Sequence, residues 1–140
     1  AADRYKEDRI AEHVSKIRVS LVLGTDGGVF PGYVNMVNVN PQIVLQANSR
    51  SLPWNHIEDM AGIFAFVLEN HLDGVYNSVA PQPTSLQDLF MTIANQVNKT
   101  EYIIQPFNGQ HIVSHKIRTA GYQFKYSNIE IAVANLLQKT

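Results

Sequence analysis

The sequence contains no cysteine among its 140 residues. This absence excludes a disulfide scaffold, a thiolate metal site and a cysteine nucleophile, and it is typical of proteins in a reducing compartment. An excess of charge of one sign is also lacking, because 11 Lys and Arg residues stand against 12 Asp and Glu residues. We therefore expect no nucleic-acid partner and no attraction to an anionic membrane.

Long hydrophobic runs are absent as well. No apolar stretch approaches the roughly 20 residues that a transmembrane helix needs, and the N-terminal residues AADRYKEDRIAEH are charged where a secretory signal would be apolar. These features favour a cytoplasmic protein without a membrane partner. With 45% hydrophobic residues, the chain suffices for one compact core but not for two ordinary domains.

Strand-like patterns recur along the chain. The run IRVSLVLG at residues 17–24 predicts a strand buried on both faces, as in a parallel sheet, and VYNSVA at 75–80 predicts a second short buried strand. Weaker patterns predict strands at 42–46 and 101–107. The stretch HKIRTAGYQFKY at 115–126 predicts a short helix, a glycine turn and a further strand.

Three helices are predicted from apolar residues that recur at helical spacing. The clearest follows His56 and ends at Asp73-Gly74, with Glu58 or Asp59 in its first turn, where the positive end of the helix dipole favours a carboxylate. The other two helices each follow a capping box, whose side chains satisfy the first free backbone N–H groups. These boxes are Thr84 with Gln87, before a helix that reaches Val97, and Ser127 with Glu130, before a helix at 129–138. The alternation of strands and helices indicates the α/β class.

Three longer stretches resemble one protein family: LVLGTDGGVF, PWNHIEDMAGIFAFVLENHLDGVYNSVAP and AGYQFKYSNIEIAVANLL. They follow, in order, a V-L-G-x-x-G-G loop, a W-I-H-I-x-D-L segment, a G-V-x-N-x-x-A-P strand end and an A-G-[YF]-x-[FY] motif. This pattern is similar to the C-terminal half of NAD-dependent epimerase-like proteins of the extended short-chain dehydrogenase/reductase superfamily, in the poorly characterised epimerase-like or cell-division-inhibitor-like branch. The resemblance runs from about Ile17 to Leu137, and Asn55 departs from it because the branch has an apolar residue there.

The resemblance implies the C-terminal portion of an extended Rossmann-type short-chain dehydrogenase/reductase fold, without the N-terminal dinucleotide-binding half. On this basis residues 1–140 form a single partial domain. Residues 1–16 are expected to end a helix of the missing half. Residues 17–56 are expected to form the buried strand, the Gly-rich loop and a substrate-side segment, and residues 57–140 the C-terminal α/β segment.

The cofactor and the catalytic pair are implied by the resemblance alone. Relatives use NAD or NADP, bound by a Gly-rich turn, and a Tyr-x-x-x-Lys pair, and both features lie upstream of the matching part. The glycines at 24–28 follow the wrong strand and lack the spacing of a dinucleotide fingerprint, and Tyr5 with Arg9 is rejected as a catalytic pair because arginine cannot readily replace the lysine. We therefore assign no catalytic residue and no cofactor to this chain alone. Leu23 and Gly24 are expected near the nicotinamide end of the cofactor in a full-length parent protein. The alternative is that the loop after this strand is only a strand-ending turn.

The resemblance places Arg50, Trp54, His56 and Asp59 on the substrate side. Superfamily members use an arginine in this stretch to bind a nucleotide-sugar phosphate, but the spacing from Arg50 to His56 is unusual, so a solvated arginine is favoured. His56 and Asp59 either organise the loop that closes the active site or serve the helix start, Asp59 as its cap and His56 as a buried, hydrogen-bonded side chain. The second role is favoured because capping needs nothing outside this chain. Trp54 is favoured as a core anchor over a stacking platform.

No metal site is expected. His111 and His115 stand four residues apart, but no carboxylate or third ligand accompanies them in the sequence. The other histidines show no pairing of this kind.

Two functions remain open. The first is the substrate-side C-terminal region of an NAD(P)-dependent sugar-nucleotide epimerase-like protein, which is not catalytically competent without its cofactor half. The alternative is a non-enzymatic binding or regulatory module that retains a remnant of the fold. An exposed sheet edge would bind the missing N-terminal half or lead to self-association. The substrate is left open, because the chain is shorter between Phe107 and Ala120 than family members, in a region that roofs their substrate pocket.

Overall fold

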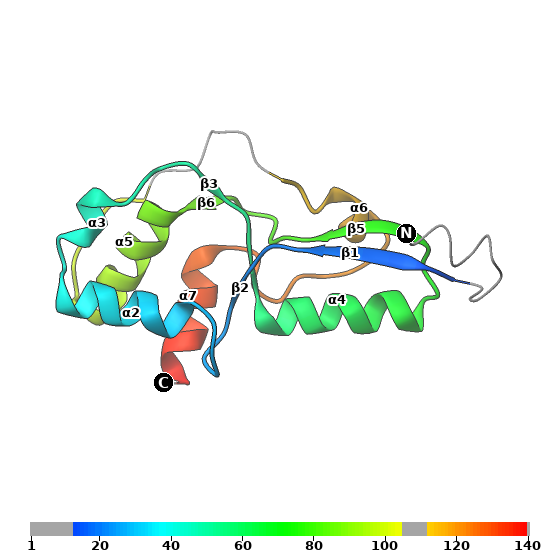
Figure 1. The fold of residues 1–140 in the computed structure, drawn as a ribbon, viewed down its shortest axis with the longest axis horizontal. Helices are drawn as coiled ribbons and strands as arrows, with labels where there is room; N and C mark the ends of the chain where they lie inside the picture. The colour runs from blue at the N-terminus through cyan, green and yellow to red at the C-terminus, as the bar shows by residue number, and fades with distance from the viewer. Residues whose placement is uncertain (1–12, 105–111, 140) are drawn as a thin grey trace.

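The computed structural model describes residues 13–104 and 112–139 (Figure 1). The expectations for residues 1–12 and 105–107 fall outside this part of the chain. The elements are β1 (Ser15–Val19), β2 (Leu21–Leu23), α2 (Phe30–Val39), α3 (Ile43–Gln46), β3 (Ser51–Leu52), β4 (Trp54–His56), α4 (Ile57–Glu69), β5 (Gly74–Ser78), β6 (Thr84–Ser85), α5 (Leu86–Val97), α6 (His115–Thr119) and α7 (Ile129–Gln138). In Figure 1 a helical lobe of α2, α3, α5 and α7 lies beside a lobe in which α4 and α6 pack against β1 and β5.

β1 and β2 form one extended segment that is broken at Ser20. Before the break, β1 runs parallel to β5 along its whole length. After the break, β2 runs parallel to β4, with Leu23 opposite His56. The chain that leaves β5 continues along the other side of β4, where Ala80 N donates a hydrogen bond of 2.7 Å to Trp54 O. β4 therefore enters the sheet at a fork between β2 and the continuation of β5.

Asn55 of β4 bonds both arms of this fork. Its side-chain amide donates to Ser20 Oγ (2.9 Å) and to the Leu21 carbonyl (3.2 Å), and its Oδ1 accepts a hydrogen bond from the Ser78 hydroxyl (2.9 Å). Asn55 and Ser78 are both fully buried. A buried amide is stable only when its donors and acceptor are satisfied, and here the two strands satisfy all of them.

The core consists of two hydrophobic clusters. The larger one fills the helical lobe, where Trp54 and Leu23 from the strands meet Phe90 of α5 and Leu136 of α7. The smaller one lies between α4, β5 and α6. Its buried members are Ile63, Val67, Tyr76 and Ile117.

Several predicted strands are wrong. Residues 43–46 form the short helix α3, because this apolar segment packs against α5 and not into a sheet. Residues 101–104 and 122–126 contain no strand. The strand predicted at 17–24 exists but starts at Ser15 and breaks at Ser20. It is not buried on both faces, since Val19 is 45% exposed. The strand predicted at 75–80 is confirmed by β5.

The three predicted helices are confirmed, but two of their caps lie one residue later than predicted. Ser85 Oγ accepts from Asp88 N at the start of α5, and Asn128 Oδ1 accepts from Ile131 N at the start of α7. Thr84 does not cap α5, because it pairs with Leu52 in the antiparallel ladder of β3 and β6. The short helix and the turn at Gly121 are also confirmed by α6 and by a positive φ of 116°.

Candidate functional site

A Gly-rich loop at residues 24–28 leaves the carboxyl end of β2. Gly27 (φ 139°) and Gly28 (φ 75°) adopt a backbone conformation that residues with side chains rarely take, and this lets the chain turn from β2 toward α2. Because β2 and β4 are parallel, both end at the same edge of the sheet, beside the start of α4. Ligands of open α/β sheets bind outside the carboxyl ends of the strands, so this edge is the first candidate for a site.

A cavity of about 550 Å³ lies at this edge. Its walls come from β2, the Gly-rich loop, the first turn of α4 with Ile57, and the end of α7 with Lys139. Of the two residues expected near a cofactor, Gly24 lines the cavity, whereas Leu23 is fully buried in the larger hydrophobic cluster and is not part of the lining. Asp26 and Lys139 supply one charge of each sign. We call this space the loop cavity.

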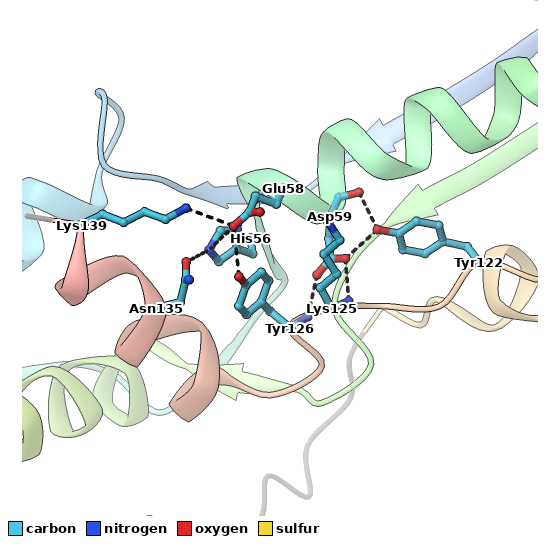
Figure 2. A network of polar contacts seen from close by, with 8 residues as sticks. All are labelled: His56, Glu58, Asp59, Tyr122, Lys125, Tyr126, Asn135 and Lys139. Carbon is cyan, nitrogen blue, oxygen red and sulfur yellow. Dashed lines mark hydrogen bonds and ion pairs between the residues drawn. The ribbon is translucent and has the colours of Figure 1, made fainter.

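His56 caps α4 and also contacts α7 (Figure 2). Its Nδ1 accepts a hydrogen bond from Glu58 N (3.0 Å), and its Nε2 lies 2.8 Å from Asn135 Oδ1, so the ring proton sits on Nε2. The ring stacks on Tyr126 with 3.9 Å between centroids. Burial lowers the pKa of His56 below its ordinary value, because the charged form would lose its hydration. His56 is therefore a neutral, fully bonded side chain.

Asp59 binds the segment that leads to α7. Its Oδ1 accepts hydrogen bonds from the Tyr122 hydroxyl (2.6 Å) and from Lys125 N (2.9 Å), and its Oδ2 accepts one from Tyr126 N (2.9 Å). The side chain is fully buried. Burial raises the pKa of Tyr122, and the hydrogen bond to Asp59 raises it further. The expectation that Asp59 caps the helix is wrong, since His56 is the cap and Asp59 bonds outward from the first turn.

Glu58 completes this polar network at the surface. Its Oε2 accepts hydrogen bonds from the Tyr126 hydroxyl (3.1 Å) and from Lys139 Nζ (3.2 Å). The bond from Lys139 lowers the pKa of the Glu58 carboxyl below its ordinary value. Three side chains at the start of α4, those of His56, Glu58 and Asp59, thus bind the chain between α6 and the end of α7, as Figure 2 shows. This network fixes α7, which forms one wall of the loop cavity.

Trp54 is an anchor of the core. Its side chain is fully buried in the larger hydrophobic cluster, and its Nε1 donates a hydrogen bond of 3.0 Å to the Gln82 carbonyl. The ring therefore has no face free to stack on a ligand.

Arg50 lies apart from the other three residues expected on the substrate side. It is exposed, and it lines a second cavity of about 350 Å³ with Tyr33, Ser51 and Leu86. Ser51 Oγ is buried and has no hydrogen-bond partner among the described residues. We call this space the arginine cavity. It differs from the loop cavity in every lining residue.

His111 lies outside the described residues, and His115 is exposed on α6. Within 13–104 and 112–139, no three His, Asp or Glu side chains gather as a metal ion would require. None of the helices in this part of the chain is both long and apolar enough to cross a membrane.

No sequence pattern assigns a role to four residues of the polar network: Tyr122, Tyr126, Asn135 and Lys139. Asn135 is 79 residues from His56, and Tyr122 is 63 residues from Asp59. Periodicity reports only neighbours along the chain, so it cannot pair them. The one available hint is the A-G-Y-Q-F motif, which contains Tyr122.

Comparison with known proteins confirms the resemblance. No protein-family model matches the chain. The mouse epimerase family protein SDR39U1 is 26% identical to it over 138 residues, which cover 86% of this chain and 47% of the mouse protein. The chain therefore spans about half the length of the curated relatives that it matches.

Solved structures match the fold. The human epimerase family protein SDR39U1 (isoform 2), solved with NADPH, matches with a TM-score of 0.62 and 23% identity, over 91% of this chain and 49% of the human one. The UDP-N-acetylglucosamine 4-epimerase from Bacillus cereus matches with a TM-score of 0.71 and 16% identity, over 98% of this chain and 49% of that one. The predicted α/β class and the C-terminal portion of a Rossmann-type epimerase fold are thus confirmed.

Proposed function

We propose that this chain is the substrate-side, C-terminal region of an NAD(P)-dependent sugar-nucleotide epimerase-like protein and that it is inactive without a dinucleotide-binding half. The observation that carries the proposal is the loop cavity at the carboxyl ends of two parallel strands, in a chain similar to epimerase family proteins. In the proposed reaction of the longer protein, the nicotinamide cofactor oxidises a sugar hydroxyl and returns the hydride after inversion. The chain is then one partial domain, and the catalytic residues belong to the other half.

The loop cavity suits the nicotinamide end of NAD or NADP. Gly24 gives it a wall without a side chain, and Ile57 and Met60 give it an apolar one that fits a flat ring. Leu23 supports this wall from within the core. The human relative that was solved with NADPH supports the choice of cofactor class.

The arginine cavity suits the nucleotide of a sugar-nucleotide substrate. An arginine guanidinium binds phosphate through paired hydrogen bonds. Arg50 is exposed at this cavity, and among the described residues its guanidinium makes no hydrogen bond. Ser51 Oγ offers a buried hydroxyl that a ligand can satisfy. Trp54, His56 and Asp59 are positioning residues in this proposal, because they fix the elements that carry the cavities.

The required partner is a dinucleotide-binding half that covers the open side of the sheet. The relatives are about twice as long as the part that this chain matches, which leaves room for a half of that size. We also propose a cytoplasmic location, which the cysteine-free composition favours.

Cofactor binding tests the proposal. The protein produced from its complete reading frame is titrated with NADH and with NADPH, and binding is followed by calorimetry. We expect one of them to bind, and we expect Gly24→Val to weaken binding about tenfold or more, since an added side chain enters the loop cavity. A Cβ at Gly24 already meets Ile57 at 3.4 Å.

Gly32→Val is the matched control, because a Cβ at Gly32 meets no atom within 4 Å and Gly32 lies on α2, outside the loop cavity. It should bind the cofactor as the unchanged protein does. If neither cofactor binds, or if the two variants lose affinity equally, the epimerase-like function is wrong, and the non-enzymatic module becomes the better description.

Binding of UDP tests the substrate side separately. Arg50→Gln should weaken UDP binding about tenfold, as expected for the loss of one charged phosphate contact. Arg18→Gln, at another exposed arginine on β1, should not. UDP affinity that is unchanged by Arg50→Gln would remove Arg50 from the site.

A further inference from the structure

Two Asp-Gly pairs lie in the described part of the chain, Asp26–Gly27 and Asp73–Gly74. In such a pair the backbone nitrogen of the glycine can attack the carboxyl of the aspartate, because glycine has no side chain to block the approach. The same two residue types occur in both pairs, but their surroundings in the fold differ. A difference in reactivity between the pairs is therefore a property of the structure.

The first pair lies open in the Gly-rich loop. Asp26 and Gly27 are both exposed, in the bends between β2 and α2. Among the residues that the structure describes, neither the Asp26 carboxylate nor the Gly27 N–H makes a hydrogen bond. A Cβ at Gly27 meets no atom within 4 Å. Both reacting groups are therefore free, and the space beside the glycine is open.

The reacting groups of the second pair are both hydrogen-bonded to the backbone of Val14. Asp73 Oδ1 accepts a hydrogen bond of 2.8 Å from Val14 N, and Gly74 N donates one of 3.1 Å to the Val14 carbonyl. Asp73 Oδ2 also lies 3.2 Å from His13 Nδ1. Gly74 is the first residue of β5 and pairs with Ser15 of β1. The nitrogen of this pair can reach the carboxyl only after the start of β5 has separated from β1.

The reaction at Asp26 needs no reagent except water. The Gly27 nitrogen bonds to Cγ of the Asp26 carboxyl, the Cγ–OH bond breaks, and one water leaves with the proton of the amide. Water then adds to the main-chain carbonyl carbon of the succinimide ring that has formed, and breaks its bond to the Gly27 nitrogen, which takes a proton. The product is isoaspartate, in which the main chain runs through Cγ and the free carboxylate stands on Cα. One water is lost and one is gained, so the mass of the chain does not change.

We propose that Asp26–Gly27 is a site of spontaneous isoaspartate formation in the folded protein, whereas the fold protects Asp73–Gly74. The exposed isoaspartyl carboxylate is then a methyl acceptor for a carboxyl methyltransferase that uses S-adenosylmethionine. Its formation adds one main-chain carbon to the loop and alters a wall of the loop cavity, which Asp26 and Gly27 both line. This site does not depend on the proposed function, because the reaction needs only the open loop.

Ageing of the protein from its complete reading frame tests the proposal. The protein is kept at neutral pH and physiological temperature for several weeks, and trypsin then releases Asp26 in the peptide of residues 19–50 and Asp73 in that of residues 51–99. Isoaspartate in each peptide is measured with an isoaspartyl methyltransferase and labelled S-adenosylmethionine, and its position is found by electron-transfer fragmentation. We expect isoaspartate to form at Asp26 at least about tenfold faster than at Asp73, which reacts only after local unfolding. In urea the two sites should react at similar rates.

Asp26→Glu is the matched control, because it keeps the charge but requires a larger ring, which closes more slowly. The peptide of residues 19–50 should then stay free of isoaspartate. Isoaspartate that persists there would come from another residue and would overturn the proposal. No reaction at Asp26, or equal rates at Asp26 and Asp73 in the folded protein, would overturn it as well. A slower reaction at Asp73 in urea would do the same, because the difference would then come from the neighbouring sequence and not from the fold.

Discussion

The Asp59 carboxylate accepts a hydrogen bond of 2.6 Å from the Tyr122 hydroxyl, across 63 residues of sequence. This bond joins the first turn of α4 to the segment between α6 and α7. Two backbone N–H groups, of Lys125 and Tyr126, bind the same carboxylate. The buried side chain of Asp59 therefore helps to position α7, and with it one wall of the loop cavity.

Replacing this carboxylate should destabilise the chain strongly. Asp59→Asn turns one acceptor oxygen into a donor that faces a donor, and we expect a loss of about 2–4 kcal/mol in the free energy of unfolding. Tyr122→Phe removes only the hydroxyl that donates to Asp59 and should cost about 1 kcal/mol. Urea unfolding of both variants measures these losses, with Asp26→Asn in the exposed loop as the control. Equal stability of Asp59→Asn and the control would refute the role of Asp59.

The histidine cap should make stability depend on pH. Burial lowers the pKa of His56 in the folded chain, so the unfolded chain, with an ordinary value near 6.5, binds the proton more readily. Stability is therefore fully present above this value and is lost as the pH falls below it. The lowered pKa of Glu58 acts in a more acidic range, as the pH falls below the ordinary carboxyl value of 4.5.

The free energy of unfolding, measured from about pH 7.5 to about pH 5, should fall less steeply for His56→Asn than for the unchanged chain. Asparagine still caps a helix but does not titrate. His115→Asn, at an exposed histidine, should leave the slope unchanged. A slope that is identical in all three proteins would show that the protonation of His56 is not linked to folding.

The fork at Asn55 predicts non-additive effects. Asn55→Ile leaves the Ser78 hydroxyl and the Leu21 carbonyl buried without their partner, and should cost about 2–4 kcal/mol. Adding Ser78→Ala removes one of these unsatisfied groups, so the double variant should lose less than the sum of the two single variants. Urea unfolding of the four proteins of this cycle gives the coupling energy. Strict additivity would mean that the bond between Asn55 and Ser78 contributes nothing.

The position of the cap of α7 can be tested with two neighbouring residues. Asn128→Ala removes the side chain that binds Ile131 N and should cost about 1 kcal/mol. Ser127→Ala should cost much less, because Ser127 contributes its backbone carbonyl, to Gln82 N, and this carbonyl remains. Thermal unfolding of the two variants decides between the cap in the structure and the cap predicted by the sequence. A larger loss for Ser127→Ala would favour the sequence prediction.

Local patterns predict the helices better than the strands. The apolar residues of α4, α5 and α7 repeat at helical spacing, and each of these helices buries one apolar side. α2 is missed because Pro31 and Gly32 favour an irregular stretch, although proline is well placed in the first turn of a helix. α3 is mistaken for a strand because a run of three apolar residues carries no periodicity, and its packing against α5 decides its structure.

The candidate site could be predicted only in part. The stretch that contains His56 and Asp59 stands out in the sequence, and Gly24 follows from the end of a predicted strand. Their partners in the structure, Asn135 and Tyr122, are brought near by tertiary folding alone. The break at Ser20 could not be predicted from local patterns either. β1 and β2 have different neighbours in the sheet, but in the sequence they form one nearly continuous apolar run.

The hydrogen bonds to the Asp59 carboxylate determine when, during synthesis, this part of the protein can fold. The ribosome makes a chain from its N-terminus, and early segments can fold before later ones exist. The groups that satisfy Asp59 are synthesised 63 to 67 residues after it, and the partner of His56 comes 79 residues after it. Until Tyr122 has been synthesised, the start of α4 therefore carries a carboxylate with none of its partners, which keeps this turn in water. The nascent chain can close this cavity wall only when α7 has emerged.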